Sequence, residues 1–174
     1  GFRARSVYKL LQLSRRYRII SKRDKVLDLG SYPGSWLQAI LQLGGHPIGV
    51  DIKKIENIKG VKFIQGDVFN KGVIDKIRKH GPYDVVISDL APNTTGIKDI
   101  DQEKSYFLAE QALEIARVAL NKNGKFMCKI FQGEGTATLI ENIKRSFRFV
   151  KASKPEASNK RSKEMYIIAA GFNR

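Results

Sequence analysis

Apolar positions along the chain fall into two patterns, short continuous runs typical of buried strands and longer stripes typical of helices. The short runs predict strands at 25–30, 47–52, 61–65, 83–89 and 125–131. The stripes predict helices at 35–43, 70–80, 102–120 and 136–147, with Asn123-Gly124 as a left-handed cap that closes the third helix. Strands that alternate with helices predict an α/β fold with a mostly parallel, doubly wound sheet.

The C-terminal part of the chain departs from this alternation. Two strand-like runs, at about 148–154 and 164–172, are joined by a loop at 155–163 and not by a helix. Because parallel neighbours need a longer crossover, this pair predicts one antiparallel strand in the sheet. No internal repeat, low-complexity tract or linker marks a second domain, so we expect residues 1–174 to form a single domain.

The N-terminal segment combines a helical apolar stripe at 5–18 with a strong excess of positive charge. Up to residue 25 it carries nine Lys and Arg residues against one acid, Asp24. A solvated helix face is the ordinary outcome for a charge run. The imbalance of sign favours a basic arm at 1–23 that faces RNA.

The net charge of the whole chain points to the same partner. It is +15 over 174 residues, more than solubility requires, and predicts a polyanionic ligand. Nucleic acid is favoured over an anionic membrane because no amphipathic anchor and no apolar run of about 20 residues is present. A single cysteine, Cys128, excludes an internal disulfide and a zinc cluster and indicates a reducing, cytoplasmic compartment. No metal site is evident.

The stretch VLDLGSYPGSW at 26–36 predicts a strand, a tight glycine loop and the start of a helix. Such a loop lets a ligand approach the backbone at the positive end of the helix. Pro33 between the glycines and the bulky Trp36 after them leave little room for a pyrophosphate. The loop therefore suits a nucleoside without phosphates, such as S-adenosylmethionine, and an ordinary strand–turn–helix corner is the alternative.

Four predicted strands end in a carboxylate: Asp28, Asp51, Asp67 and Asp89. The carboxyl ends of parallel strands share one edge of a sheet, so these side chains are expected to face one crevice. Asp51 follows Gly34 by 17 positions, near the ~20-residue offset of an acid that binds ribose hydroxyls. Asp67 suits the adenine amino group, and we expect Asp28 to order the glycine loop by hydrogen bonds to its backbone.

Lys129 interrupts the apolar run FMCKIF at 126–131. A buried ammonium group is costly unless it is paired. An edge-strand lysine that blocks aggregation is the alternative, but a run flanked by predicted helices indicates a central strand. We therefore interpret Lys129 as functional, with Asp89 as its partner.

Five motifs in order resemble the FtsJ/RrmJ family of RNA 2′-O-methyltransferases: RARSVYKL at 3–10, DLGSYPGSW at 28–36, SDLAPN at 88–93, CKIFQGEG at 128–135 and KPEASNKRSKEMY at 154–166. The resemblance implies a Rossmann-like class I fold, S-adenosylmethionine as cofactor, and a catalytic tetrad at Lys9, Asp89, Lys129 and Glu164. The cofactor contacts that it implies fall on Gly34, Trp36, Asp51, Asp67 and Asp89, to which the glycine loop adds Gly30, Pro33 and Ser35.

The resemblance also implies an RNA partner and a surface to hold it. The SDLAPN and KIFQGEG wording is most similar to the branch that methylates a uridine of large-subunit ribosomal RNA; transfer-RNA and cap methylation are the alternatives within the family. A non-catalytic ribosome assembly factor and a nicotinamide-dependent enzyme are alternatives outside it. We expect a monomer whose RNA contacts flank the active site from two sides: Arg3, Arg5, Arg15, Arg16, Lys154, Lys160, Arg161 and Lys163.

The cofactor loop departs from the family pattern at Ser31-Tyr32 and Ser35. Ser35 is a mild change. Tyr32 is larger than the usual residue, so it either crowds the cofactor or stacks on it.

Overall fold

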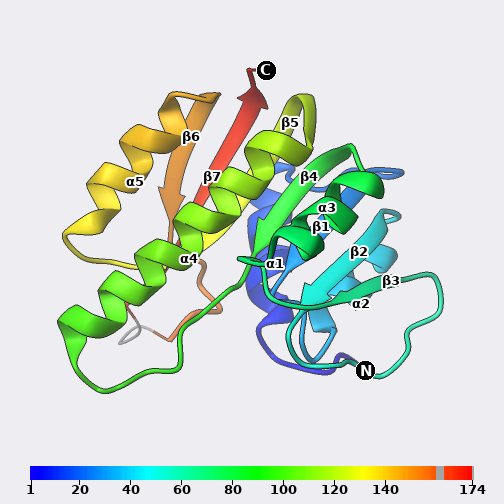
Figure 1. The fold of residues 1–174 in the computed structure, drawn as a ribbon, viewed down its shortest axis with the longest axis horizontal. Helices are drawn as coiled ribbons and strands as arrows, with labels where there is room; N and C mark the ends of the chain where they lie inside the picture. The colour runs from blue at the N-terminus through cyan, green and yellow to red at the C-terminus, as the bar shows by residue number, and fades with distance from the viewer. Residues whose placement is uncertain (160–162, 174) are drawn as a thin grey trace.

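Seven strands form one mixed sheet in the computed structural model, which describes residues 1–159 and 163–173. They are β1 (Lys25–Leu29), β2 (His46–Asp51), β3 (Lys62–Gln65), β4 (Tyr83–Ser88), β5 (Leu120–Phe131), β6 (Phe147–Ser153) and β7 (Glu164–Phe172). The order across the sheet is β3-β2-β1-β4-β5-β7-β6 (Figure 1). β7 runs antiparallel to both of its neighbours, β5 and β6, as the loop at 155–163 predicted, whereas the pairs among β1 to β5 are parallel. The predicted fold class is confirmed.

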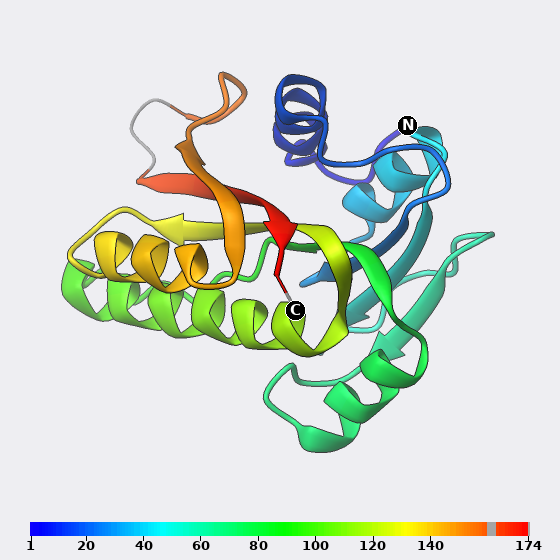
Figure 2. The same cartoon turned by 90° about the horizontal axis from the view of Figure 1, so that it is seen from above.

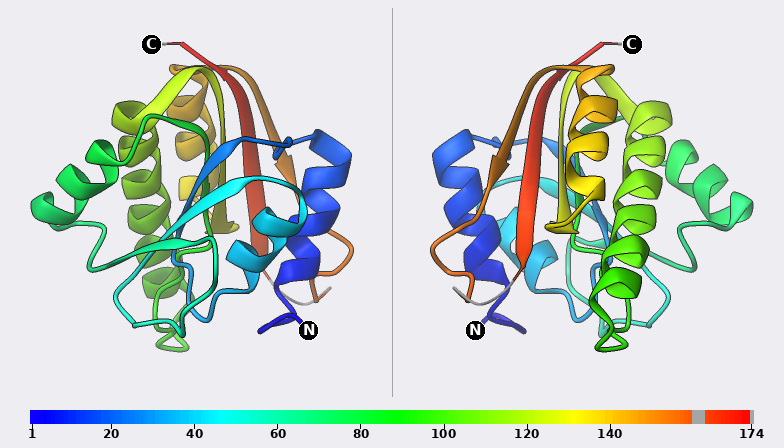
Figure 3. Two further views of the ribbon diagram at one scale, coloured as in Figure 1. Left: turned by 90° about the vertical axis from the view of Figure 1, so that its right-hand side faces the viewer. Right: turned by 90° about the vertical axis from the view of Figure 1, so that its left-hand side faces the viewer.

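Helices cover both faces of the sheet in the described part of the chain (Figures 2 and 3). They are α1 (Val7–Tyr17), α2 (Ser35–Gln42), α3 (Lys71–Lys79), α4 (Lys98–Ala119) and α5 (Gly135–Lys144). The apolar stripes of α1 and α2 pack on one face, and those of α3, α4 and α5 pack on the other. An apolar core lies on each face of the sheet. Alternate residues of each central strand contribute to the two cores, because successive side chains of a strand point to opposite faces.

The basic N-terminal segment lies against the sheet as α1. Val7, Leu10 and Leu13 are buried at three-residue spacing, and each contributes about 1.5–3 kcal/mol by leaving water. Arg15 and Arg16, on the other side of the helix, are exposed. Packing therefore fixes where this cationic surface stands relative to the strands.

The prediction that Asn123-Gly124 caps the long helix was wrong, although the helix ends within one residue of the predicted 120. α4 begins at Lys98, four residues before the predicted start, because its first turn is polar and shows no apolar stripe. The helix ends at Ala119, and extended Leu120 leads directly into β5. Asn123 does adopt a positive φ of 66°, but within the strand, where the β4–β5 register shifts and extra residues of β5 must be accommodated.

The strand order reverses between β1 and β4, because β2 and β3 lie to one side of β1 while β4, β5, β7 and β6 lie to the other. In open α/β sheets this switch point opens a crevice beyond the carboxyl ends of the strands. No helix within the described ranges is both long and apolar enough to cross a membrane.

Candidate active site

A cavity of about 320 Å³ lies at the carboxyl ends of β1, β2, β3 and β4. Four of the predicted cofactor residues line it: Gly30, Asp51, Asp67 and Asp89. Three of these four are carboxylates, which would repel a polyphosphate. The cavity therefore fits an uncharged or cationic nucleoside better than a dinucleotide.

The glycine loop forms one wall of this cavity because its backbone requires glycine. Gly30 has a φ of +80°, and a Cβ there would lie 3.2 Å from the backbone nitrogen of Leu90. Gly34 has a φ of +116° and precedes the first turn of α2. Its missing side chain also leaves space for Arg3, whose guanidinium donates to the carbonyl of Pro33 at 3.0 Å.

The remaining predicted cofactor residues, Pro33, Gly34, Ser35 and Trp36, do not line the cavity. Trp36 is buried between the sheet and α1, where its indole N–H donates to the carbonyl of Ser6 at 3.2 Å. Its side chain therefore serves the core. We expect any contact between Trp36 and the cofactor to come from its backbone.

Asp51 is held in place by backbone donors on both oxygens. One accepts from the N–H of Tyr32 at 2.8 Å and the other from the N–H of Lys53 at 2.9 Å. The ammonium of Lys53 lies 5.1 Å from the centre of the Tyr32 ring, and both side chains line the cavity. Tyr32 is half exposed, so its ring lines the wall of the cavity and does not fill it.

Asp28 lies fully buried near the carboxyl end of β1. The prediction that it orders the glycine loop by hydrogen bonds was wrong. Neither carboxylate oxygen has a hydrogen-bond partner among the residues that the structure describes. The backbone N–H groups of Gly30 and Ser31 instead donate to the carbonyl of Val50. Burial raises the pKa of Asp28 well above its usual value, and the charges of Asp89 and Asp51 raise it further. The buried environment therefore favours the neutral, protonated form of this carboxyl group.

We expect Asp28→Asn to stabilise the free protein at neutral pH. The folded-state pKa of Asp28 is raised, so the folded protein holds this proton more tightly than the unfolded chain. As pH rises through the usual carboxyl range and above it, the wild type loses stability that the amide retains, on the order of 1 kcal/mol or more. Urea unfolding from pH 4 to pH 8 measures the difference, which should shrink toward zero at the acid end.

Asp75→Asn is the matched control, because Asp75 is exposed on α3. It should leave the free energy of unfolding nearly unchanged across the same range. A loss of stability in Asp28→Asn that is equal at every pH would contradict a raised pKa and would indicate a packing defect.

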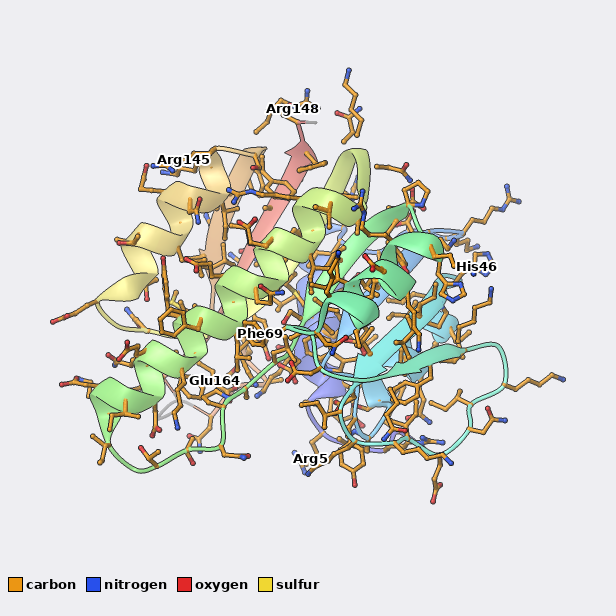
Figure 4. All side chains as sticks on the ribbon, viewed as in Figure 1. Arg5, His46, Phe69, Arg145, Arg148 and Glu164 are labelled. Carbon is orange, nitrogen blue, oxygen red and sulfur yellow. The ribbon has the colours of Figure 1, made fainter. Side chains whose placement is uncertain are left out.

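Four side chains from distant parts of the chain form a line of ion pairs beside the cavity. The ammonium of Lys9, on α1, lies 2.9 Å from Glu164 Oε2 at the start of β7. Lys129 Nζ, on β5, lies 3.8 Å from Glu164 Oε1 and 3.3 Å from Asp89 Oδ1. Glu164 and Arg5 are labelled in Figure 4 at the end of the molecule where the parallel strands terminate. β5 is central, between β4 and β7, so Lys129 is not an edge-strand lysine.

Tyr166 joins this network and was missed by the sequence analysis. Its O–H donates to Asp89 Oδ1 at 2.8 Å. Burial and the Asp89 carboxylate raise the pKa of Tyr166 well above its usual value, so the phenol stays a donor. The sequence did contain a signal, because Tyr166 follows Glu164 by two positions in β7 and therefore points to the same face.

The two acids of the network have opposite pKa shifts. Burial raises the pKa of Asp89, although Lys129 and the Tyr166 hydroxyl oppose the rise. Burial would also raise the pKa of Glu164, but Lys129 and Lys9 together outweigh it and the pKa is lowered. Glu164 is thus a firm anion between two ammonium groups, and Asp89 is the acid more easily affected by a cationic ligand.

The predicted RNA contacts divide into four groups. Arg15, Arg16 and Lys154 line one cavity of about 300 Å³, where α1 meets the end of β6. Arg5 and Lys163 are exposed, whereas Lys160 and Arg161 lie outside the described residues. Arg3 is engaged internally. Its guanidinium donates to the carbonyls of Pro33, Glu56 and Asn57 and so ties the N-terminal segment to the cofactor loop.

In the parts of the chain that the structure describes, no group of three or more His, Cys, Asp or Glu side chains is placed to hold a metal ion.

The family of FtsJ-like methyltransferases matches residues 2–172. The ribosomal RNA large subunit methyltransferase E of Syntrophobacter fumaroxidans is 45% identical over 171 residues, covering 95% of this chain and 87% of that protein. The protein of the same description from Archaeoglobus fulgidus is 41% identical over 175 residues, covering 100% of this chain and 92% of its own length.

Solved structures agree with these sequence relatives. A Plasmodium falciparum protein described as a ribosomal RNA methyltransferase superposes with a TM-score of 0.87 at 29% identity, over 98% of each chain. A Burkholderia thailandensis N-methyltransferase with bound S-adenosylhomocysteine has a TM-score of 0.64 at 14% identity, over 98% of this chain and 79% of that one. The second likeness shows a shared fold.

Proposed function

The chain belongs to the FtsJ-like methyltransferase family, and on that premise we propose that it methylates the 2′-hydroxyl of a uridine in large-subunit ribosomal RNA. The observation that carries the proposal is the line of ion pairs from Lys9 through Glu164 and Lys129 to Asp89. One end of this line reaches the cavity that suits a sulfonium nucleoside. An ammonium group able to orient a hydroxyl therefore lies beside the cofactor site.

The enzyme depends on S-adenosylmethionine. This cofactor supplies a methyl group that its sulfonium already activates. We assign the ribose hydroxyls to Asp51, whose oxygens are oriented by two backbone donors. We assign the adenine amino group to Asp67 and the cationic part of the cofactor to Asp89, and both of these side chains line the cavity.

The chemical task that remains for the protein is to orient one hydroxyl and remove one proton. Lys129 would orient the 2′-oxygen toward the methyl group of a bound cofactor. As the oxygen–carbon bond formed and the methyl–sulfur bond broke, the hydroxyl proton would pass to this lysine or to its carboxylate partners. Asp89 fixes Lys129 from the cofactor side, and Tyr166 fixes Asp89. Glu164 and Lys9 hold the opposite side of the lysine.

The cationic cavity between α1 and the end of β6 supports RNA binding by phosphate contacts. We expect the double variant Arg15→Glu/Arg16→Glu to raise the KM for RNA at least tenfold, because two phosphate contacts become repulsive. The slope of binding against salt should also become shallower. Filter binding of RNA from 50 to 300 mM salt, with the Kd for S-adenosylmethionine measured separately, tests this expectation.

Lys76→Glu/Lys79→Glu is the matched control, since these exposed lysines on α3 change the net charge equally on the other face of the sheet. Equal loss of RNA affinity in both double variants would show that only the overall charge matters. The α1 surface would then have no specific part in binding.

Mapping of 2′-O-methyl nucleotides by mass spectrometry tests the substrate. We expect one modified uridine after incubation with large ribosomal subunits or their RNA, and none in transfer RNA. Modification of transfer RNA alone would assign the enzyme to that branch. Binding to subunits without any methyl transfer would favour an assembly factor, and titration with NAD beside S-adenosylmethionine would reveal a nicotinamide enzyme.

We also propose that residues 1–174 act as one methyltransferase domain, as a monomer in the cytoplasm. The continuous sheet and the packing of α1 against it support a single unit. Light scattering on the purified chain, alone and with RNA, measures the oligomeric state.

A further inference from the structure

A second cavity, of about 330 Å³, lies on the other side of the ion-pair network from the cofactor cavity. Glu164 lines the second cavity and Asp89 lines the first, and the two share no lining residue. Lys129 Nζ is within 4 Å of both acids, at 3.8 Å from Glu164 and 3.3 Å from Asp89. The lysine therefore stands between two separate spaces, as required of a group that brings two substrates together.

We propose that this second cavity receives the nucleobase of the nucleotide whose ribose is methylated. The inference rests on the proposed function and assigns a place to its acceptor. The residues that carry it are Phe131, Gln102, Lys98 and Lys163. The rest of the lining is Gly96, Glu164 and Asp101, whose carboxylate accepts hydrogen bonds from Thr95 and Gly96.

The spacing along β5 places the base where its ribose requires it. Phe131 and Lys129 are two residues apart in the strand, so their side chains point to the same face about 7 Å from each other along it. A ribose held at Lys129 thus directs its attached base toward Phe131. Phe131 also pairs in register with Glu164 of β7, and its backbone N–H donates to Ser105 Oγ at 2.9 Å. These contacts fix the backbone of Phe131 relative to the network.

The lining has the chemistry of a nucleotide site. Phe131 is a partly exposed aromatic ring on which a base stacks. The amide of Gln102 is positioned by a bond from Nε2 to the carbonyl of Gln132 at 3.0 Å. A Cβ at Gly133 would lie 2.4 Å from Gln102 Oε1, so glycine at this position allows the amide to stay there. Lys98 and Lys163 supply positive charge for the flanking phosphates.

A neighbouring cavity sets the direction of the RNA backbone. It has a volume of about 370 Å³ and shares Gln102 and Phe131 with the second cavity. The charged residues that line this neighbouring cavity are all acids: Asp99, Glu103 and Glu134. Phosphates are repelled from that side, so the strand passes over Lys98 and Lys163 while the base alone enters.

Substitution of Phe131 tests the stacking contact. We expect Phe131→Ala to raise the KM for the RNA roughly 5- to 150-fold, the range for loss of one base–aromatic stack. Phe131→Trp should keep a KM near the wild-type value, and the Kd for S-adenosylmethionine should be unchanged in both variants. Phe149→Ala, on β6 with a side chain that is 48% exposed, is the control and should behave as wild type.

Photocrosslinking tests the location without any variant. Large-subunit RNA carrying 5-iodouridine at the methylated position should crosslink to the tryptic peptide 130–144, which contains Phe131. Crosslinks elsewhere while methylation proceeds, or a wild-type KM in Phe131→Ala, would overturn the inference. If the wild-type protein methylates no RNA at all, it is the proposed function that fails.

Discussion

Lys129→Ala is expected to lower kcat for methyl transfer by about 10³-fold or more while leaving the Kd for S-adenosylmethionine nearly unchanged. Lys129 lies between Asp89 and Glu164 and does not line the cofactor cavity. Its removal takes away the group that orients the acceptor hydroxyl, but no cavity wall. Single-turnover methylation of the mapped RNA measures the rate, and calorimetric titration measures cofactor affinity.

The loss of the lysine also leaves two acids facing each other. Side-chain exposure of Asp89 and Glu164 is 19% and 22%, so solvent moderates the repulsion and we expect a stability loss of about 1–3 kcal/mol. Thermal unfolding with bound S-adenosylhomocysteine separates this loss from the catalytic one. Lys122→Ala, at an exposed position of the same strand, is the control.

Lys129→Arg separates charge from proton handling. Arginine keeps the positive charge but stays protonated in proteins, so activity as low as in the alanine variant would assign the proton step to the amine. Wild-type rates in Lys129→Ala would remove the lysine from the mechanism altogether.

Asp89→Asn is the substitution with the second large effect, because it should impair cofactor binding and catalysis together. Asp89 lines the cofactor cavity, pairs with Lys129 and accepts from Tyr166. An amide of nearly the same shape loses the charge in all three roles. We expect the Kd for S-adenosylmethionine to rise about tenfold and kcat to fall at least 100-fold, in line with one lost charged contact and one misplaced catalytic group.

Tyr166→Phe provides the graded comparison for this prediction. It removes only the hydrogen bond to Asp89, so kcat should fall less than in Asp89→Asn, by about 10-fold or somewhat more for one hydrogen bond to a charged group, with an unchanged cofactor Kd. Asp89→Asn with a wild-type cofactor Kd would contradict the assignment of Asp89 to the cofactor. Equal effects of the two substitutions would show that Asp89 acts only through its contact with the tyrosine.

The fold could be predicted from the sequence because its signals are local. Apolar runs and stripes place the strands and most helices, and the absence of a helix between the last two runs gives the antiparallel β7. The sequence prediction was wrong where a local conformation is caused by tertiary packing. Asn123 adopts the left-handed conformation that its residue type favours, but it does so at an irregularity of β5, because β4 pairs there with a shifted register.

The individual roles of site residues could be predicted only in part. Asp28, Asp51 and Asp89 occupy similar positions at strand ends, yet Asp51 accepts two backbone hydrogen bonds and Asp28 accepts none from the described residues. Trp36 and Arg3 belong to the family motifs, but their side chains have structural contacts. Trp36 packs in the core, and Arg3 holds the cofactor loop by hydrogen bonds to backbone carbonyls. Which neighbours surround a side chain depends on packing between distant segments, and spacing along the chain does not report it.

By itself, the sequence determined the layered α/β architecture, the strand ends that carry acids, the excess of positive charge and the identity of the four network residues through their motifs. Only the tertiary structure decided that Lys9 and Glu164, 155 positions apart, meet at 2.9 Å, that Tyr166 holds Asp89, and that Lys129 divides two cavities. The physical reason is that periodicity and residue type fix local conformation and the buried face. Contact between side chains instead arises when the whole sheet and its helices pack together and bring distant segments to one edge.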